Sequence, residues 1–584
     1  MPPESDRKLA CLVCRHRKVA CDRRRPRCGL CDKNGFECEY KARDHRPGLR
    51  AGYVSQLEKR VEDLERKMEK VVGRLSEEPS HTQTETNNVS STIREPPTLD
   101  FGNAETLRTP QSNAVRMETD PSPLVASPQD LLIEPLRYEL QMVWLQRYHP
   151  WFPILHHTSV SQAFSEATST QCLLRKAIEA VTIWDIPGIT WEQKQISSTT
   201  LRQEVISSAM ESLNLRCIQA LLILSILFWG EGKWLPYSNL TAMCQRLSQQ
   251  LSLPTVAGVA RAQPSKMSTR DAATSQPEID HEERLRTFWM IEMLDSIFAL
   301  GFTSNLSTSK IPLGAKFPCS DSIWALQDPF REGVSFQNLR YSSGLSMCIS
   351  LCTVELGAVH RFQQSVAETD GAAGGLEWQS AAQRLDERLT IWREEFVAAV
   401  FRLINTESPQ DARAEMEIFI VLTNCVLNMG VITLLQSQTS LPDGVGSQTD
   451  SWPYANHRCM YACENMAAKI RRMEEDELKN CSPCLILPIF VAARFYIVHT
   501  KCLRADVSVN LHSLAYSLHI CGHRWPLAKM FESVIRTAVA EHRTPIPQSA
   551  LPIEFYDLRF SVVEICHILQ EWSDSYSSPV LHSV

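Results

Sequence analysis

Apolar residues follow two different helical periodicities along the chain. Between residues 54 and 75 they recur at alternating steps of three and four, which is the heptad repeat of a coiled coil. From residue 131 onward they recur at three- and four-residue steps inside longer segments, for example 136–150 and 282–300. No segment sustains the two-residue alternation typical of strands. The pattern predicts a short coiled coil followed by a large all-α region over residues 130–584.

The heptad repeat covers residues 53–76 and predicts a parallel two-stranded coil. Its early a positions are β-branched and its early d positions are leucine, a combination that favours two strands. Arg60 of one chain can face Glu65 of the other, which suits a homodimer. An amphipathic helix that docks on the chain's own body is the alternative. The seven core positions are Val54, Leu57, Val61, Leu64, Met68, Val71 and Leu75.

Two linkers flank the expected coil. Residues 43–52 are basic and contain Pro47, Gly48 and Gly52, which keep them from forming a continuous helix. Residues 77–129 are poor in large apolar side chains and rich in Ser, Thr, Pro, Asn and Glu. That composition is typical of a disordered linker.

Charge separates the N-terminus from the rest of the 584-residue chain. The net charge is −7, yet residues 1–50 carry 14 Lys+Arg against seven Asp+Glu and have a net charge of +7. The remaining residues therefore carry −14. A basic head on an acidic body indicates that only the head meets nucleic acid. The apolar run at 217–229 is too short to cross a bilayer, so we expect a buried helix there and no membrane partner.

Six cysteines stand in two copies of one spacing, C-x2-C-x6-C, with a period of 17 residues. Two tetrahedral zinc ions need eight sulfur ligands, and six thiolates supply eight only if two are shared. A closed shell of thiolates has no open position for catalysis, so the two zinc ions are expected to be structural. A disulfide framework and an RNA-binding or purely structural zinc module are the alternatives. The six residues are Cys11, Cys14, Cys21, Cys28, Cys31 and Cys38.

Basic residues fill the spaces between these cysteines. A basic helix start beside a basic loop is an electrostatic footprint for phosphates. The basic runs at residues 15–18 and 23–27 are compatible with nuclear localisation signals, so we expect the protein in the nucleus. The candidate DNA-binding residues are Arg15, His16, Arg17, Lys18, Arg23, Arg24 and Arg25.

With this spacing and with R-x-R-K between the second and third cysteines, residues 8–42 resemble the fungal Zn2Cys6 binuclear cluster of transcription factors. The resemblance implies that Lys18 reaches base edges of a CGG-like triplet in the major groove of double-stranded DNA. Arg15 and Arg17 would mainly contact phosphates, and Pro26 would be the loop proline. The implied ligands are bridging Cys11 and Cys28 with terminal Cys14, Cys21, Cys31 and Cys38.

The helical region also resembles a known domain. Four segments, 149–156, 219–234, 282–300 and 311–319, are similar to the fungal-specific transcription factor domain, over about 135–330. The resemblance implies an RNA polymerase II type regulator that acts with the transcription machinery or co-regulators. Regulators of this shape often control a metabolic pathway or a secondary-metabolite gene cluster.

Rival interpretations place the main activity in the helical body. It could be a corepressor or partner-binding regulator with weak DNA binding, or an effector-sensing protein that the zinc head targets. Nucleotide-binding and hydrolase motifs are missing, so we expect no enzyme. The CxxC at Cys481 and Cys484 is interpreted as structural, with a thiol switch or metal site as its alternative. His149, His156 and His157 are interpreted as surface or capped core histidines.

The heptad repeat can be tested through DNA binding. We expect Leu57→Pro combined with Leu64→Pro to weaken binding to paired half-sites far more than to a single half-site, because proline breaks the helix that pairs the two heads. Equal losses on both duplexes in a gel-shift titration would indicate a monomer.

Overall fold

The computed structural model divides the chain into two compact units, Met1–Glu118 and Thr119–Val584. All regular elements among the described residues are helices, as the hydrophobic pattern predicted. The predicted coiled coil and the predicted linker at 77–129 lie outside the described residues. The structure describes most positions of 11–38 and the ranges 133–165, 169–258, 277–301, 315–324, 343–368, 376–406, 412–439 and 453–577.

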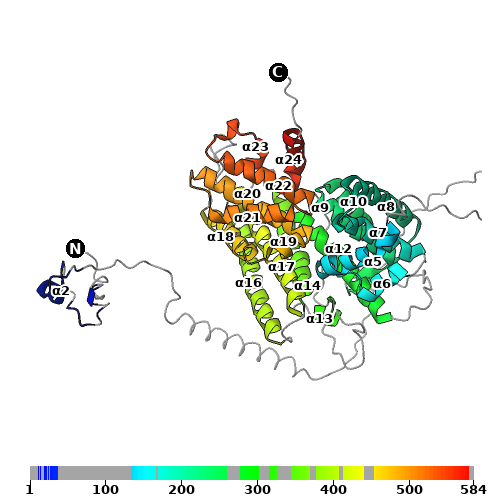
Figure 1. Cartoon of the computed structure of the whole chain (residues 1–584), viewed down its shortest axis with the longest axis horizontal. Coiled ribbons are helices and arrows are strands. Elements are labelled where there is room, and N and C mark those ends of the chain that lie inside the picture. Colours follow the sequence, from blue (N-terminus) through cyan, green and yellow to red (C-terminus); the bar gives the residue numbers. More distant parts are fainter. Residues whose placement is uncertain are drawn as a thin grey trace, which may run out of the picture. The chain divides into compact units, whose positions relative to one another are not determined.

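The first half of the helical body contains short and medium helices that pack largely in chain order. Helix α7 lies against α8 and α9, α9 against α10, and α10 against α12. Figure 1 shows these helices gathered on one side of the body. They are α5 (Arg137–Val143), α6 (His157–Ser165), α7 (Ser169–Thr182), α8 (Trp191–Glu211), α9 (Leu215–Gly230), α10 (Trp234–Gln250), α11 (Leu253–Val256), α12 (Pro277–Leu300) and α13 (Asp321–Trp324).

The second half is organised around α17, which packs against α14, α16, α18 and α20. A π-helical stretch, η6 (Leu351–Leu356), joins α14 to α15 and also packs on α12, so the two halves share one core. The helices of this half are α14 (Gly344–Ser350), α15 (Gly357–Glu368), α16 (Leu376–Thr406), α17 (Ala412–Leu435), α18 (Pro453–Ile470), α19 (Glu475–Lys479), α20 (Ile486–Cys502), α21 (Val509–Cys521), α22 (Pro526–Ala540), α23 (Ile553–Tyr556) and α24 (Val562–Ser577).

Several helices are apolar because the body surrounds them. The run at 217–229 lies in α9, which is buried at nearly every position. Three further stretches, Gly344–Val366, Ile418–Gln438 and Pro483–Cys502, are long and apolar enough to cross a membrane. Within the body, 78%, 83% and 94% of their most apolar windows is buried. Packing inside the core therefore accounts for their composition.

A buried polar cluster ties the two halves together. Asp185 accepts hydrogen bonds from Arg147, at 2.7 Å, and from the Tyr148 hydroxyl, at 2.5 Å. Arg524, just before α22, donates to the same hydroxyl at 2.9 Å and lies 3.3 Å from the Asp185 carboxylate. Burial raises the pKa of Tyr148, so the phenol stays protonated and donates its hydrogen bond. Removing one member would leave an uncompensated charge in the core, which is costly.

A second buried cation sets a helix break that the sequence did not indicate. Hydrophobic periodicity predicts one helix near 555–573, whereas the chain leaves the helix after Tyr556 and re-enters it at Val562. The Arg494 side chain, on α20, is 1% exposed. Burial lowers the pKa of Arg494 to about 10, which keeps it charged at neutral pH. It donates to the carbonyl oxygens of Glu554, Phe555, Asp557 and Phe560, at 2.6–3.0 Å.

We expect Arg494→Met to lower the free energy of unfolding by about 3–5 kcal/mol, because it strands four carbonyl groups in the interior. Arg536→Met is the matched control, since Arg536 is 71% exposed and pairs only with Glu532 across one helical turn. The control should change stability by less than about 0.5 kcal/mol. Urea unfolding measures the free energy of unfolding of both variants. An equal decrease in the two variants would contradict the role given to Arg494.

Candidate metal centre and nucleic-acid interface

The six N-terminal cysteines form two four-sulfur groups. In each group all sulfur atoms lie within 4.8 Å of one another. Cys11 and Cys28 belong to both groups, so the two sets share one edge. The remaining ligands are Cys14 and Cys21 in the first group and Cys31 and Cys38 in the second.

The distances between the sulfur atoms fit zinc and exclude disulfides. Cys11 lies 3.7 Å from both Cys28 and Cys31, Cys14 lies 3.6 Å from Cys28, and Cys21 lies 4.0 Å from Cys11. A tetrahedron with zinc–sulfur bonds of about 2.3 Å has edges of about 3.8 Å. A disulfide bond is only about 2.05 Å long. The donor set and its spacing therefore fit two zinc ions with shared thiolates.

The 17-residue sequence repeat reappears as a repeat of backbone hydrogen bonds. Cys14 N–H points at Cys11 Sγ, at 3.5 Å, and Cys31 N–H points at Cys28 Sγ, at 3.4 Å. Val19 N–H donates to the Cys14 carbonyl at 3.1 Å, and the equivalent Phe36 N–H donates to the Cys31 carbonyl at 3.0 Å. Each copy thus turns its CxxC pair inward in the same way. Cys28 also caps α2 (Gly29–Lys33), so a metal ligand begins the helix.

Metal binding must displace protons from these thiols. Burial raises the pKa of the Cys31 thiol to about 12 and raises the pKa of Cys14 further. Both are protonated at neutral pH before a metal binds. Zinc holds the thiolate form, so zinc affinity falls as the pH falls. Four of the six sulfurs are fully buried, and they are the core of this small segment.

The described cations of this segment lie on its surface. The Arg17 guanidinium stacks on the Phe36 ring at 4.3 Å, which links the two copies of the repeat. Arg24 lies 3.7 Å from Asp22, whose carboxylate accepts the Gly29 N–H at 2.9 Å. The sequence interpretation missed Asp22, Gly29 and Phe36, because only the fold brings them to their partners. The other predicted DNA-binding residues, Arg15, His16, Lys18, Arg23 and Arg25, lie outside the described residues.

Gly29 is required by a close approach. A Cβ at this position would lie 2.6 Å from Asp22 Oδ2, closer than side-chain atoms tolerate. The carboxylate can therefore reach the first N–H of α2 only because residue 29 has no side chain. This contact fixes the loop between the two copies against the second CxxC.

The candidate groups in the body are structural. Cys481 Sγ lies 3.5 Å from Cys521 Sγ, and it makes no metal group with Cys484. Within the described part of the chain, only the N-terminal cysteines gather into metal-ligating groups. The His149 ring bonds to the Leu155 carbonyl at 2.8 Å, and burial lowers its pKa to about 4. His156 is fully buried and lies 2.7 Å from the Thr158 hydroxyl, while His157 is half-buried.

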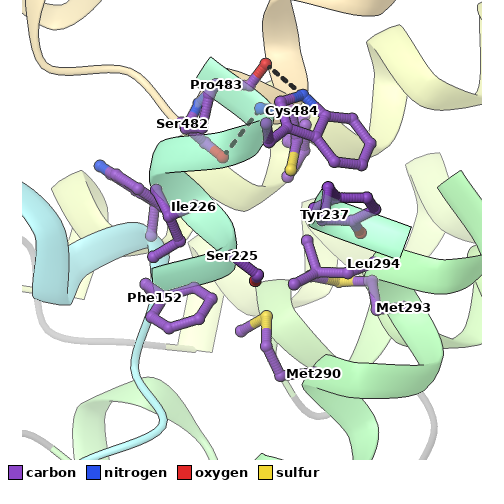
Figure 2. A pocket seen from close by; sticks show the side chains of 13 residues that line it. Phe152, Ser225, Ile226, Tyr237, Met290, Met293, Leu294, Ser482, Pro483 and Cys484 are labelled. Carbon is purple, nitrogen blue, oxygen red and sulfur yellow. Dashed lines mark hydrogen bonds between the residues drawn. The ribbon is translucent and has the colours of Figure 1, made fainter. Parts of the chain in front are cut away.

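Aromatic side chains of the body also belong to the core. Figure 2 shows a pocket between α9, α10 and α12 that is lined by Phe152, Tyr237, Met290 and Met293. Its volume of about 10 Å³ holds no more than one water molecule. Trp229 also lines this pocket, and its indole N–H donates to the Pro483 carbonyl at 3.0 Å, which links α9 to the segment before α20.

Comparison with known families identifies the class of protein. Residues 9–47 match the fungal Zn(2)-Cys(6) binuclear cluster domain, and residues 142–394 match the fungal specific transcription factor domain. The chain belongs to the fungal Zn(2)-Cys(6) transcription factors. It is therefore a DNA-binding regulator that carries two zinc ions and is no enzyme, as the sequence predicted. The match to the fungal specific transcription factor domain ends at residue 394, whereas the resemblance in the sequence was clearest over 135–330.

Individual members of this family share different degrees of sequence identity with the chain. The chain is 63% identical, over the full length of both proteins, to the notoamide biosynthesis cluster transcriptional coactivator notQ' of Aspergillus versicolor. It is 24% identical to the citrinin biosynthesis transcriptional activator mrl3 of Monascus ruber, over 65% of this chain and 78% of the relative. No solved structure matches the chain.

The shared sulfurs make a prediction about zinc content. We expect Cys11→Ser to release both zinc ions, because Cys11 belongs to both four-sulfur groups. Cys244→Ser is the matched control, since this thiol is equally buried but lies in α10, and it should retain both ions. Elemental analysis of the purified variants measures the number of zinc ions per chain. One zinc ion retained by Cys11→Ser would show that Cys11 does not bridge.

Proposed function

We propose that the protein activates transcription of a secondary-metabolite biosynthetic gene cluster by binding DNA in the nucleus. The observation that carries the proposal is the 63% identity to a cluster coactivator, together with the binuclear cluster geometry. A second relative, also named for its biosynthetic cluster, supports the same class of target genes. The names of these relatives, a coactivator and an activator, favour activation over repression.

In the proposed mechanism the zinc cluster holds one recognition surface rigid. Lys18 follows the second cysteine and would read the base edges of a CGG-like triplet in the major groove. Exposed Arg17, Arg24 and Arg27 would lie along phosphates, with Arg17 steadied by its stacking on Phe36. Phosphate contacts would supply most of the affinity and make it fall with salt, while base contacts would select the sequence.

The proposed domain order places two such heads on one DNA site. Residues 8–42 would bind DNA, and the 15 residues 39–53, which include the basic linker 43–52, would set the spacing between half-sites. Residues 53–76 would pair two chains through their heptad positions, and 77–129 would form a disordered linker. The body, 130–584, would contact the transcription machinery or co-regulators. A two-fold dimer of this kind reads two triplets, so its affinity for a paired site exceeds that of a single head.

A second candidate is a partner-binding coactivator with weak DNA binding of its own. The word coactivator in the name of the relative favours it. The two candidates differ in their need for the zinc cluster. Replacing the chromosomal gene by Cys11→Ser should abolish cluster transcripts if the protein acts through DNA. Transcripts that persist at the wild-type level would favour the partner-binding alternative.

Base reading by Lys18 can be separated from phosphate binding. We expect Lys18→Ala to cost about 1–3 kcal/mol on a selected site and little on random DNA. Arg27→Ala is the control for phosphate contact and should weaken both duplexes alike. Fluorescence anisotropy titrations measure both affinities, and an equal loss on both duplexes for Lys18→Ala would contradict base reading.

A further inference from the structure

A large cavity lies in the helical body where its two halves meet. Its volume is about 650 Å³, within the range of small-molecule sites, in contrast to the pocket in Figure 2. The helical segment after α5, residues 144–151, forms one wall, α17 forms the second, and the segment from the end of α18 to the start of α20 forms the third. The lining includes Arg147, Trp151, Val421, Leu422, Lys469, Arg472, Asp476, Glu477 and Leu485.

Each of the three walls contributes apolar side chains to the cavity. Trp151, Leu422 and Leu485 are each buried, and Val421 is half-buried. The Trp151 side chain is only 4% exposed. A bound molecule with a flat apolar surface would fit against these side chains.

The acidic residues of the rim are already engaged, whereas two of the cations are not. The Asp476 carboxylate pairs with Lys479 at 3.1 Å, and Glu477 accepts the Glu474 N–H at 2.7 Å as part of the cap of α19. Lys469 and Arg472 form no ion pair with any carboxylate that the structure describes. The N–H that Glu477 accepts is neutral and leaves its charge in place, so Lys469 and Arg472 face one uncompensated carboxylate and the rim carries a net positive charge.

A third cation is held in place before any ligand arrives. Arg147 Nη1 donates to Asp185 at 2.7 Å, and its Nε donates to Asn480 at 2.5 Å. Neither contact uses Nη2. Because Asp185 also bonds to Tyr148 and Arg524, this cation belongs to the cluster that joins the two halves of the body. A cation fixed by its neighbours binds an anion with little loss of side-chain entropy.

We propose that this cavity binds a small amphipathic anion. Its flat aromatic body would pack on Trp151, Leu422 and Leu485, and its carboxylate or sulfonate would lie against Lys469 and Arg147. The proposal rests on the lining of the cavity and is independent of DNA binding.

Two dyes of matched shape test the proposal on the full-length chain. The anionic dye is 8-anilinonaphthalene-1-sulfonate, and N-phenyl-1-naphthylamine is its neutral counterpart. Fluorescence titration should show one saturable site for the anionic dye. Lys469→Gln should weaken the anionic dye about tenfold and leave the neutral dye unchanged, because it removes one charge-assisted contact. Lys529→Gln, an exposed lysine on α22, is the matched control and should change neither affinity.

A variant that fills the cavity completes the experiment. Val421→Trp should abolish binding of both dyes, and its urea midpoint reports whether the body remains folded. If that variant unfolds, the pair Lys469→Gln and Lys529→Gln decides alone. Equal effects of the two lysine variants, an absence of saturable binding, or unchanged binding by folded Val421→Trp would each overturn the proposal.

Discussion

The sharing of Cys11 and Cys28 between the two four-sulfur groups is the constraint on which the N-terminal unit depends. Its described core consists of four buried cysteines, since no larger apolar cluster exists among the described residues of that segment. Cys28 belongs to both four-sulfur groups, caps α2 and donates its backbone N–H to Cys38 Sγ. Removing the metal would therefore remove the core, the cap and the register of the repeat together.

The helical body is stabilised by buried apolar surface and not by metal ligands. Its helices bury large apolar surfaces, and α9, α20 and the part of α17 from Ile418 onward lie almost wholly inside it. Polar side chains in this interior have specific tasks: Asp185 joins the two halves, and Arg494 holds the chain between α23 and α24. Such groups contribute less to net stability than to a unique arrangement of helices, because a misplaced helix would leave a buried charge unpaired.

Sequence alone predicted the cluster well because its ligands are local and repeated. The CxxC spacing and the 17-residue period carry the geometry, so Cys11–Cys38 could be assigned without any distant contact. Helical periodicity likewise predicted an all-α body. The break at Asp557 was not predictable, since the residues that end the helix are held by Arg494, some 60 positions earlier. The contact of Cys481 with Cys521 was not predictable either, because the two residues stand 40 positions apart, and the cavity beside Cys481 combines side chains from three separate segments.

The account predicts that recognition of DNA appears only when the cluster is complete. Zinc should be titrated into the metal-free full-length protein while fluorescence anisotropy follows binding to a duplex selected from random sequences. Binding should rise with the second equivalent of zinc per chain, because both four-sulfur groups share the sulfurs that position the basic segment. Specific binding that is complete after one equivalent, or that occurs without zinc, would contradict the account.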